Sequence, residues 1–191
     1  MTTSTRRVLD RRTSWEGVLL TLVLLVGGFV ALWTSNYIGD QVSGQLSMQD
    51  ITMPSGAALK ALPAKDAAAL QPFAGQKMTR GDQAEAFADH YIIVHMNKAS
   101  GGQTYNAVSG KFLAMAKDPN ADQKQLASLG ELRQTLFMGN TLRGLLLNAY
   151  AVGTIGVVAF WAGVGMLVAA ALMLVLVALG FRHARTGVIR R

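Results

Sequence analysis

Two histidines, His90 and His95, flank a short apolar run and lie close to Glu85 and Asp89, a set of side chains that could bind a metal. Ligand pairs on a helix need a spacing of three or four residues to share a face. At five residues apart, the two histidines point about 140° away from each other. We therefore predict no metal site. We expect Asp89 to pair with His90 or a nearby lysine, and His95 to lie on a packing face.

A second candidate is Ser109-Gly110-Lys111, which is similar to the end of a phosphate-binding loop. Phe112 stands where that loop needs Ser or Thr to coordinate magnesium, and the upstream glycine is misplaced. There is no G-x-S-x-G motif, so the scattered serines form no recognisable catalytic triad. The absence of cysteine excludes thiolate metal sites and cysteine nucleophiles. We predict that the protein is not an enzyme and has no cofactor.

Composition indicates a membrane protein. Of 191 residues, 15% are charged, against about 25% in ordinary soluble domains. The apolar fraction of 51% is concentrated in two blocks, Val18–Trp33 and Tyr150–Phe181, neither of which contains a charged residue. These values exclude a disordered chain, a coiled-coil rod and a typical cytosolic enzyme. The fold class we predict is mainly α, with two transmembrane helices flanking a small extracytoplasmic helical domain.

We place the first transmembrane helix at residues 15–37, because 23 residues give roughly 30 Å of helix. The second, at 150–181, exceeds the roughly 20 residues needed, so it tilts or projects beyond the bilayer. Two short spans turning at Gly163-Val164-Gly165 are a less favoured alternative. The first span is also similar to a signal peptide, but it lacks a small-x-small cleavage site at the right distance. We interpret it as a retained anchor.

Residues at the expected membrane interfaces are aromatic or basic, types that anchor helices at the headgroup level. They are Trp15, Trp33, Tyr37, Arg143, Tyr150, Arg182 and Arg185.

Orientation follows from the arginines of the two tails, residues 1–14 and 182–191. The segment between the spans has ten Lys or Arg and nine Asp or Glu, so it is nearly neutral. The positive-inside rule places both termini in the cytoplasm and residues 38–149 outside. We expect the basic tails to meet membrane lipids rather than nucleic acid. Their simplest role is to fix the topology.

The outward segment has two parts. Residues 38–80 carry three prolines at nine-residue spacing among alanines and predict an extended linker, with at most one helical turn between prolines. A short edge strand over 49–54, ended by Pro54, is possible within it. Residues 81–149 predict a helical domain. Its first helix begins at Asp82, which forms a capping box with Glu85.

Three helices are expected in this domain. The apolar stripe of the first consists of Ala84, Phe87, Ala88, Tyr91 and His95, and Gly101-Gly102 ends it. The second covers Thr104 to Lys117. The third begins near Asn120 or Asp122 and continues into the second span, with a possible bend at Gly139 or Gly144. Its buried face is formed by Leu126, Leu129, Leu132, Leu136 and Phe137.

The second span contains small residues at close spacing, which allow helices to approach closely in lipid. We expect them to form a packing face, most simply against the first span. They are Ala149, Gly153, Gly156, Ala159, Gly163, Gly165 and Ala169. Neither span contains a buried Asp, Glu, Lys or Arg, which argues against an ion path or proton relay.

The segments FADHYIIVHM, SGGQTY and LRQTLFMGNTLRGLLLNAYAVGTIG, between Ala86 and Gly156, carry a G-G-x-T-Y element and an L-R-x-x-L-F element. With these the chain resembles uncharacterised two-span membrane proteins of high-GC Gram-positive (actinobacterial) bacteria. The matching positions are Gly101, Gly102, Thr104, Tyr105, Leu132, Arg133, Leu136 and Phe137. The resemblance implies a bacterial plasma membrane and no established activity.

The function we predict is that of a non-catalytic plasma-membrane protein, an accessory or scaffold subunit of a larger membrane assembly. Its partner would be another membrane protein or a second copy of itself. The alternative is an extracytoplasmic sensor that binds a small ligand. A cytoplasmic tail of about ten residues weakens this alternative, because no signalling domain is available to receive a message. Catalysis is a distant third.

Overall fold

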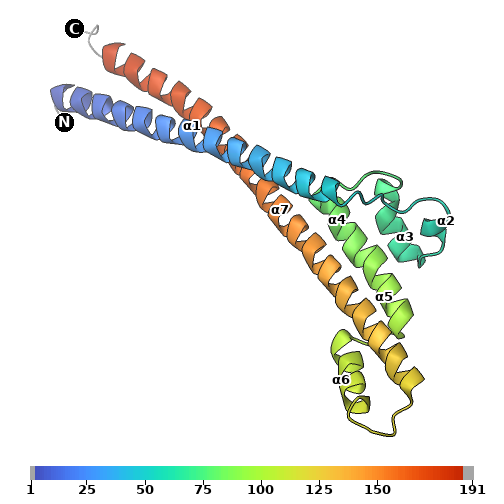
Figure 1. Cartoon of the computed structure of the whole chain (residues 1–191). Helices are drawn as coiled ribbons and strands as arrows, with labels where there is room; N and C mark the ends of the chain where they lie inside the picture. Colours follow the sequence, from blue (N-terminus) through green and yellow to red (C-terminus); the bar gives the residue numbers. More distant parts are fainter. Residues whose placement is uncertain (1–2, 187–191) are drawn as a thin grey trace. The chain divides into compact units, whose positions relative to one another are not determined.

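The computed structural model describes residues 3–186, and side chains from residue 11 to residue 184. The protein is mainly helical, with 83% helix and no β-strand among the described residues, which confirms the mainly α part of the predicted class. The elements are long helices at the two ends of the chain with short ones between them (Figure 1): α1 (Thr3–Met48), α2 (Ala57–Lys60), α3 (Ala64–Leu70), the 3-10 helix η1 (Gln71–Phe73), α4 (Gly81–Phe87), the π-helix η2 (Ala88–Ile92), α5 (Ile93–Ser100), α6 (Tyr105–Met115) and α7 (Gln123–Thr186).

Within the described part of the chain, two helices are long and apolar enough to cross a membrane. They are α1 over Arg11–Met48 and α7 over Gln123–Ala184, and only 11% of the most apolar stretch of each is buried. A helix that is apolar all round would be buried in a soluble protein. The predicted spans 15–37 and 150–181 lie inside these two helices.

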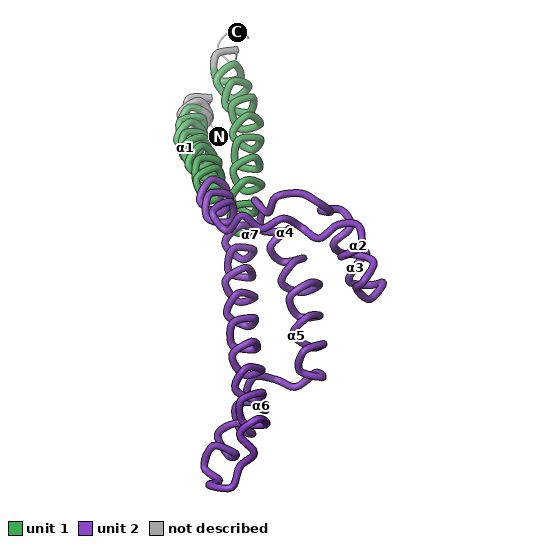
Figure 2. The backbone as a smooth tube through the Cα atoms, turned by 45° about the vertical axis from the view of Figure 1, so that its right-hand side comes forward, with its two compact units in different colours: residues 1–38, 155–191 green, residues 39–154 purple. Residues whose placement is uncertain are grey.

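The chain divides into two compact units, shown in different colours in Figure 2. Unit 1 consists of Met1–Ile38 and Ile155–Arg191, and unit 2 consists of Gly39–Thr154. Each of the long helices α1 and α7 therefore contributes one part to each unit.

In unit 1, α1 and α7 run antiparallel and meet through small residues spaced seven positions apart. These are Ser14, Thr21 and Gly28 on α1, with Gly156, Gly163 and Ala170 on α7, and all six are buried. A Cβ built on Gly163 would lie 3.0 Å from the carbonyl oxygen of Gly28, and one built on Gly156 would lie 3.0 Å from Cγ2 of Ile38. The glycines therefore allow close approach, and the seven-residue period is typical of paired helices that coil around each other.

Helix α1 continues to Met48, whereas we expected an extended linker from residue 38. The extension buries Val42 and Leu46, which are 7% and 3% exposed. These residues lie four positions apart on one face of the helix. They bury apolar surface only while the segment stays helical, which explains the difference.

Pro63 and Pro72 stand at the starts of helices instead of interrupting them. Pro63 is the N-cap of α3, which is seven residues long, and Pro72 lies in the first turn of η1. Proline is favoured there, because the first turn of a helix leaves N–H groups without partners. The expected linker is thus largely helical.

The expected edge strand over 49–54 is reduced to one antiparallel bridge between Thr52 and Lys77. The Met53 N–H donates to the Gln76 carbonyl at 2.8 Å, and the Met78 N–H donates to the Ile51 carbonyl at 2.9 Å. Met53 and Met78 are each 1% exposed. The bridge therefore holds two buried side chains, and Pro54 stops it from growing into a strand.

Helix α4 begins at Gly81, with Arg80 as its N-cap, which corrects the predicted cap at Asp82. The side-chain oxygen of Gln83 accepts hydrogen bonds from the Thr79 and Arg80 N–H groups at 2.8 and 3.1 Å. The Asp82 carboxylate instead accepts two 3.0 Å hydrogen bonds from the Arg80 guanidinium, which raises the pKa of Arg80. Because Asp82 is engaged by its neighbour, Gln83 supplies the cap.

The segment from α4 to α5 lies along α7 in unit 2. A Cβ built on Gly81 would lie 3.0 Å from Cα of Tyr150, and one built on Gly139 would lie 2.6 Å from Sδ of Met96. Gly139 and Gly144 both lie within the uninterrupted helix α7. Gly139 thus provides room for Met96, and the helix does not end at either glycine.

Candidate functional site

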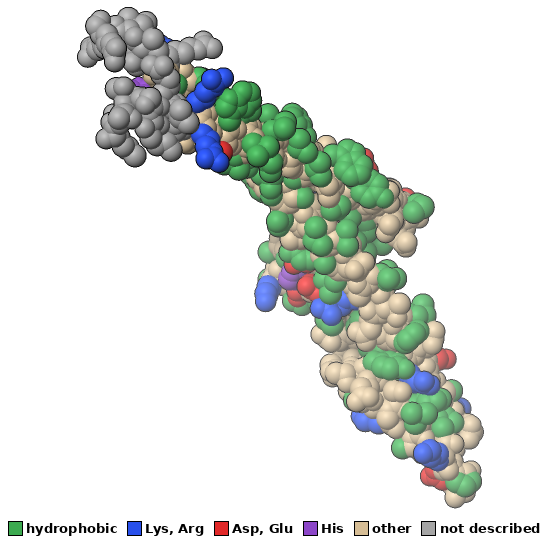
Figure 3. All heavy atoms as spheres, turned by 90° about the vertical axis from the view of Figure 1, so that its left-hand side faces the viewer, with side chains coloured by type: hydrophobic (Ala, Val, Ile, Leu, Met, Phe, Trp, Pro, Cys, Tyr) green, Lys and Arg blue, Asp and Glu red, His purple; other side chains and the backbone are tan. Residues whose placement is uncertain are grey.

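The chemistry-bearing residues around His90 form two separate pairs, a hydrogen bond between His90 and Asp66 and an ion pair between Arg143 and Asp89. His90 Nδ1 lies 2.8 Å from Oδ1 of Asp66, and Arg143 donates to Oδ1 of Asp89 at 2.7 Å from Nη2 and 3.1 Å from Nε. Asp89 was expected to pair with His90 or a lysine, so its pairing with Arg143 is a correction. Figure 3 shows acidic, basic and histidine side chains gathered in one place on the visible face. The first pair links η2 to α3 and the second links η2 to α7, and neither exposes a nucleophile.

The π-helical turn η2 displaces the packing face of the first helix by one residue. Instead of the expected Tyr91 and His95, the buried residues are Ile92 and Met96, at 8% and 7% exposure. His95 is exposed and hydrogen-bonds the Tyr91 carbonyl oxygen at 2.8 Å. A π turn inserts one extra residue into the helix, which shifts every later residue around the axis. Among the described residues there is no group of three or more His, Asp or Glu that could hold a metal.

Ser109-Gly110-Lys111 lies in the middle of α6 and not in a loop. The Lys111 ammonium donates a hydrogen bond to the side-chain oxygen of Gln103. A phosphate loop needs successive backbone N–H groups that are free to bind the ligand, and a helix interior uses them in its own hydrogen bonds. This segment therefore has no phosphate-binding geometry.

The hairpin of α6 and α7 brings together residues that the sequence analysis treated separately. Thr104 caps α6 by accepting a 3.3 Å hydrogen bond from the Ala107 N–H. The Tyr105 and Phe137 rings lie 6.0 Å apart. The Arg133 guanidinium lies over the Phe112 ring, 5.1 Å from its centre. The elements G-G-x-T-Y and L-R-x-x-L-F thus meet at one place in unit 2.

These contacts surround a small hollow of about 210 Å³, which we call the α6–α7 hollow. It is lined by Tyr105, Gly130, Arg133, Gln134 and Phe137. Gly130 makes room for Phe112, because a Cβ there would lie 3.2 Å from Cε2 of that ring. Leu136 is 1% exposed as expected, whereas Phe137, also predicted to be buried, is 52% exposed. The hollow therefore has a packed floor and an exposed aromatic rim.

The composition of the α6–α7 hollow favours a protein partner over a small ligand. Ligand pockets usually enclose about 300–1,000 Å³, and this hollow is smaller. Tyrosine, phenylalanine and arginine are enriched at protein interfaces, and exposed arginine and aromatic side chains dominate binding energies there. Met138, next to Phe137 in the sequence, is 59% exposed. The sequence analysis did not assign Phe112 or Gly130 to this site. The one signal for them is the short connection between α6 and α7, which brings the two helices together as a hairpin.

Several predicted interface residues take part in contacts. In unit 1, Trp15 meets Phe181 edge-on with ring centres 6.1 Å apart, and Trp33 stacks on Tyr37 at 5.8 Å. In unit 2, Tyr150 packs its backbone against Gly81, and Arg143 is paired with Asp89 as described above. The Arg185 side chain lies outside the described residues.

The predicted small residues are divided among three environments. Gly156 and Gly163 contact α1 in unit 1, with Ala159 half-buried nearby on the same helix. Ala149 and Gly153 face Gly81 in unit 2. Gly165 faces open space, and Ala169 is half-buried while its neighbour Ala170 is completely buried. The seven-residue spacing visible in the sequence would have identified Ala170.

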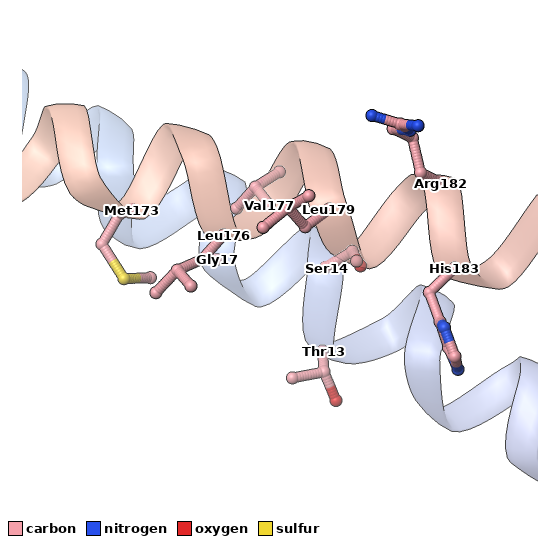
Figure 4. A pocket seen from close by; sticks show the side chains of 10 residues that line it. Thr13, Ser14, Gly17, Met173, Leu176, Val177, Leu179, Arg182 and His183 are labelled. Atoms are coloured by element: carbon pink, nitrogen blue, oxygen red, sulfur yellow. The ribbon is translucent and has the colours of Figure 1, made fainter.

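Unit 1 also contains a wide cleft of about 840 Å³ at the end where Ser14 meets Gly180 (Figure 4). Its lining combines apolar residues of α7, including Met173, Leu176 and Val177, with the hydroxyls of Thr13 and Ser14. Arg182 and His183 extend from α7 in opposite directions in this view. Such a mixture of apolar and basic side chains is typical of a helix end at a membrane surface.

No protein-family model matches this chain, and no detectable match exists among the curated proteins or the solved structures.

Proposed function

We propose that this protein is a two-span integral plasma-membrane protein that serves as a non-catalytic accessory or scaffold subunit of a larger membrane assembly. The low burial of the most apolar stretches of α1 and α7 supports the two spans, since 11% burial leaves most of their apolar surface for lipid. The resemblance to two-span membrane proteins of high-GC Gram-positive bacteria supports a bacterial plasma membrane.

The proposed orientation has both termini in the cytoplasm and residues 38–149 outside the cell. The support is the distribution of arginine, since eight of the 18 Lys and Arg residues lie in the short tails. Basic residues next to a span are retained on the cytoplasmic side. In this orientation the α6–α7 hollow faces outward.

The observation that carries the docking role is the exposed rim of the α6–α7 hollow. Phe137 and Met138 are 52% and 59% exposed, on a part of α7 that precedes the proposed span by about twelve residues. Lipid does not cover them there, so their exposure to water is unfavourable by about 25 cal/mol per Å² of apolar surface. A partner membrane protein that buries this rim would remove that cost.

Photocrosslinking in living cells tests this docking role directly. A photoreactive amino acid at Met138 should capture one defined partner band, because this exposed side chain is next to Phe137 in the sequence. The same amino acid at Asn97, an exposed position on α5, is the control and should capture none. Equal capture at both positions, or none at either, would overturn the docking role of the hollow.

A further inference from the structure

A second cavity lies in unit 2, between the final turns of α1 and the middle of α7. It encloses about 320 Å³ between residues 41–46 of α1, Gln49 in the turn after that helix, and residues 142–152 of α7. Its floor is formed by Val42, Leu46 and Leu146, which are 7%, 3% and 2% exposed. The volume falls within the range usual for ligand sites. We call it the amide groove.

The polar part of the amide groove consists only of carboxamides. Gln41 and Gln45 are four residues apart on one face of α1, Gln49 lies in the turn that follows the helix, and Asn148 lies on α7. All four are exposed, and none of their side chains makes a hydrogen bond with the described part of the chain. Each carboxamide offers two donors and an acceptor. An apolar floor with several unpartnered amides matches an uncharged ligand rich in hydroxyl groups.

Charge around the groove also disfavours an anionic ligand. None of the lining residues is charged. The adjacent Arg143 is paired with Asp89, and the adjacent Asp50 is paired with Lys77. Asp40, next to Gln41, adds a negative charge that would repel a phosphate. A phospholipid headgroup would therefore lack the cation that its phosphate needs.

The depth of the groove selects a lipid as its occupant, an argument that rests on the proposed membrane spans. Counting along α1, Gln41 lies about 6 Å and Gln45 about 12 Å beyond Tyr37, the expected end of the first span. The headgroup layer occupies roughly 5–7 Å on each side of the hydrocarbon core. On α7, Val152 lies inside the expected second span. The groove therefore begins in the headgroup layer and extends outward from it.

We propose that the amide groove binds the uncharged, hydroxyl-rich headgroup of a glycolipid. The headgroup hydroxyls hydrogen-bond Gln41, Gln45 and Asn148. The glycerol and the first acyl carbons lie over Ala149 and Val152, where the lining of the groove enters the proposed span. This role is independent of partner docking, because the groove and the α6–α7 hollow share no residue.

Native mass spectrometry of the full-length, detergent-purified protein tests the proposal. The probe is an equimolar mixture of dioleoyl lipids that differ only in the headgroup: monogalactosyl-diacylglycerol, phosphatidylcholine and phosphatidylglycerol. We expect the galactolipid to form the predominant one-to-one adduct. In the double variant Gln41→Leu with Gln45→Leu, this preference should fall by about tenfold, since two neutral hydrogen bonds to the headgroup are removed.

The matched control is Gln123→Leu with Gln125→Leu, two exposed glutamines at the start of α7 that lie outside the groove, and it should keep the preference. Because the substituted groove glutamines are also exposed, an unchanged circular dichroism spectrum should confirm that both variants fold. Equal binding of the three lipids, a preference for phosphatidylglycerol, or a preference that the groove variant retains would each overturn the proposal. Release of the protein from membranes by alkaline carbonate would instead contradict the proposed spans.

Discussion

Helix α7 makes two different kinds of contact in the two units. In unit 1 it meets α1 through small uncharged residues, and the Cβ positions of Gly28 and Gly163 each lie within 3.2 Å of the other's carbonyl oxygen. In unit 2 the same helix meets its neighbours through the Asp89–Arg143 ion pair and the aromatic and cationic side chains of the α6–α7 hollow. The change in contact type follows the change in charge along the helix.

The contacts of each unit suit the solvent that we propose for it, which is lipid for unit 1 and water for unit 2. In lipid, apolar side chains gain nothing by leaving the solvent, so helices associate by close van der Waals packing of small residues. In water, burial of apolar surface and pairing of partly buried charges both contribute. Large apolar side chains in unit 1 remain exposed, as at Leu19 and Val158 with 64% and 63% exposure.

We expect the largest loss of stability from Gly163→Leu, in the contact between α1 and α7 of unit 1. A side chain there meets the Gly28 carbonyl oxygen and Leu32, neither of which can withdraw without separating the helices. We expect unit 1 to lose about 3 kcal/mol or more, at the upper end of overpacking costs. Unfolding in mixed detergent micelles, followed by circular dichroism, measures the change. Gly165→Leu is the control, because a Cβ at Gly165 meets no atom within 4 Å. Equal losses in both variants would contradict the proposed packing.

The next effect concerns the charges of unit 2. Asp89→Ala leaves Arg143 half-buried without its partner, and we expect a loss of about 1–2 kcal/mol in the free energy of unfolding. The double variant Asp89→Ala with Arg143→Met should recover part of this loss, because it removes the unpaired charge. Denaturant unfolding of the full chain measures both. If the double variant is no more stable than the single one, the ion pair does not stabilise unit 2 as we describe.

A smaller change in stability is expected from alanine substitution at two glycines of α7, with opposite signs at the two positions. Gly139→Ala should destabilise unit 2 by about 1 kcal/mol, because its Cβ meets Sδ and Cγ of Met96 at 2.6 and 2.8 Å. Gly144→Ala should stabilise the helix by about 0.5–1 kcal/mol, since it meets no atom within 4 Å and reduces the entropy of the unfolded chain. Thermal melts of the two variants should shift in opposite directions. A shift in the same direction would contradict the close approach of α5 to α7.

The smallest effect is expected at the exposed Asp50–Lys77 pair. Lys77 donates a 2.6 Å hydrogen bond to Asp50, which lowers the pKa of Asp50 from its ordinary 3.8. A lowered pKa in the folded state stabilises the protein above pH 4, and this contribution is lost as pH falls through the pKa of the folded state. Lys77→Met should flatten that part of the acid unfolding curve, whereas Lys60→Met should leave it unchanged. Identical curves for Lys77→Met and the parent protein would show that the pair contributes nothing.

The sequence predicted the parts of the fold that depend on local chemistry. The uncharged run from Val18 to Trp33 predicted a long apolar helix, and the start of the third helix near Asp122 is confirmed, since the Asp122 carboxylate caps α7 by accepting from the Lys124 N–H at 2.8 Å. Helix α6 ends at Met115, before the Asp118-Pro119 break. Such signals need only a few neighbouring residues, so they can be recognised without knowledge of the fold.

Features that depend on distant contacts were not predicted. The π turn at η2 moves the buried position from His95 to Met96, and Met96 packs where Gly139 on α7 provides room. No local pattern marks that insertion. Phe137 fits a buried helical stripe by spacing, but its exposure depends on where α6 lies. The sequence analysis identified the G-G-x-T-Y and L-R-x-x-L-F elements separately. It did not predict the α6–α7 hollow, because the two elements come together only when α6 and α7 form a hairpin.

Native-gel migration of a chromosomally tagged copy, extracted in mild detergent, tests whether the α6–α7 hollow docks the protein onto a larger complex. The unchanged protein should migrate with a large complex, and mass spectrometry of that band should identify the partner. Phe137→Ala, which removes an exposed ring from the edge of the hollow, should release the protein from the complex, whereas Asn97→Ala should not. Migration of the unchanged protein at the mass of a monomer, or identical migration of the Phe137→Ala variant, would contradict a docking role for the α6–α7 hollow.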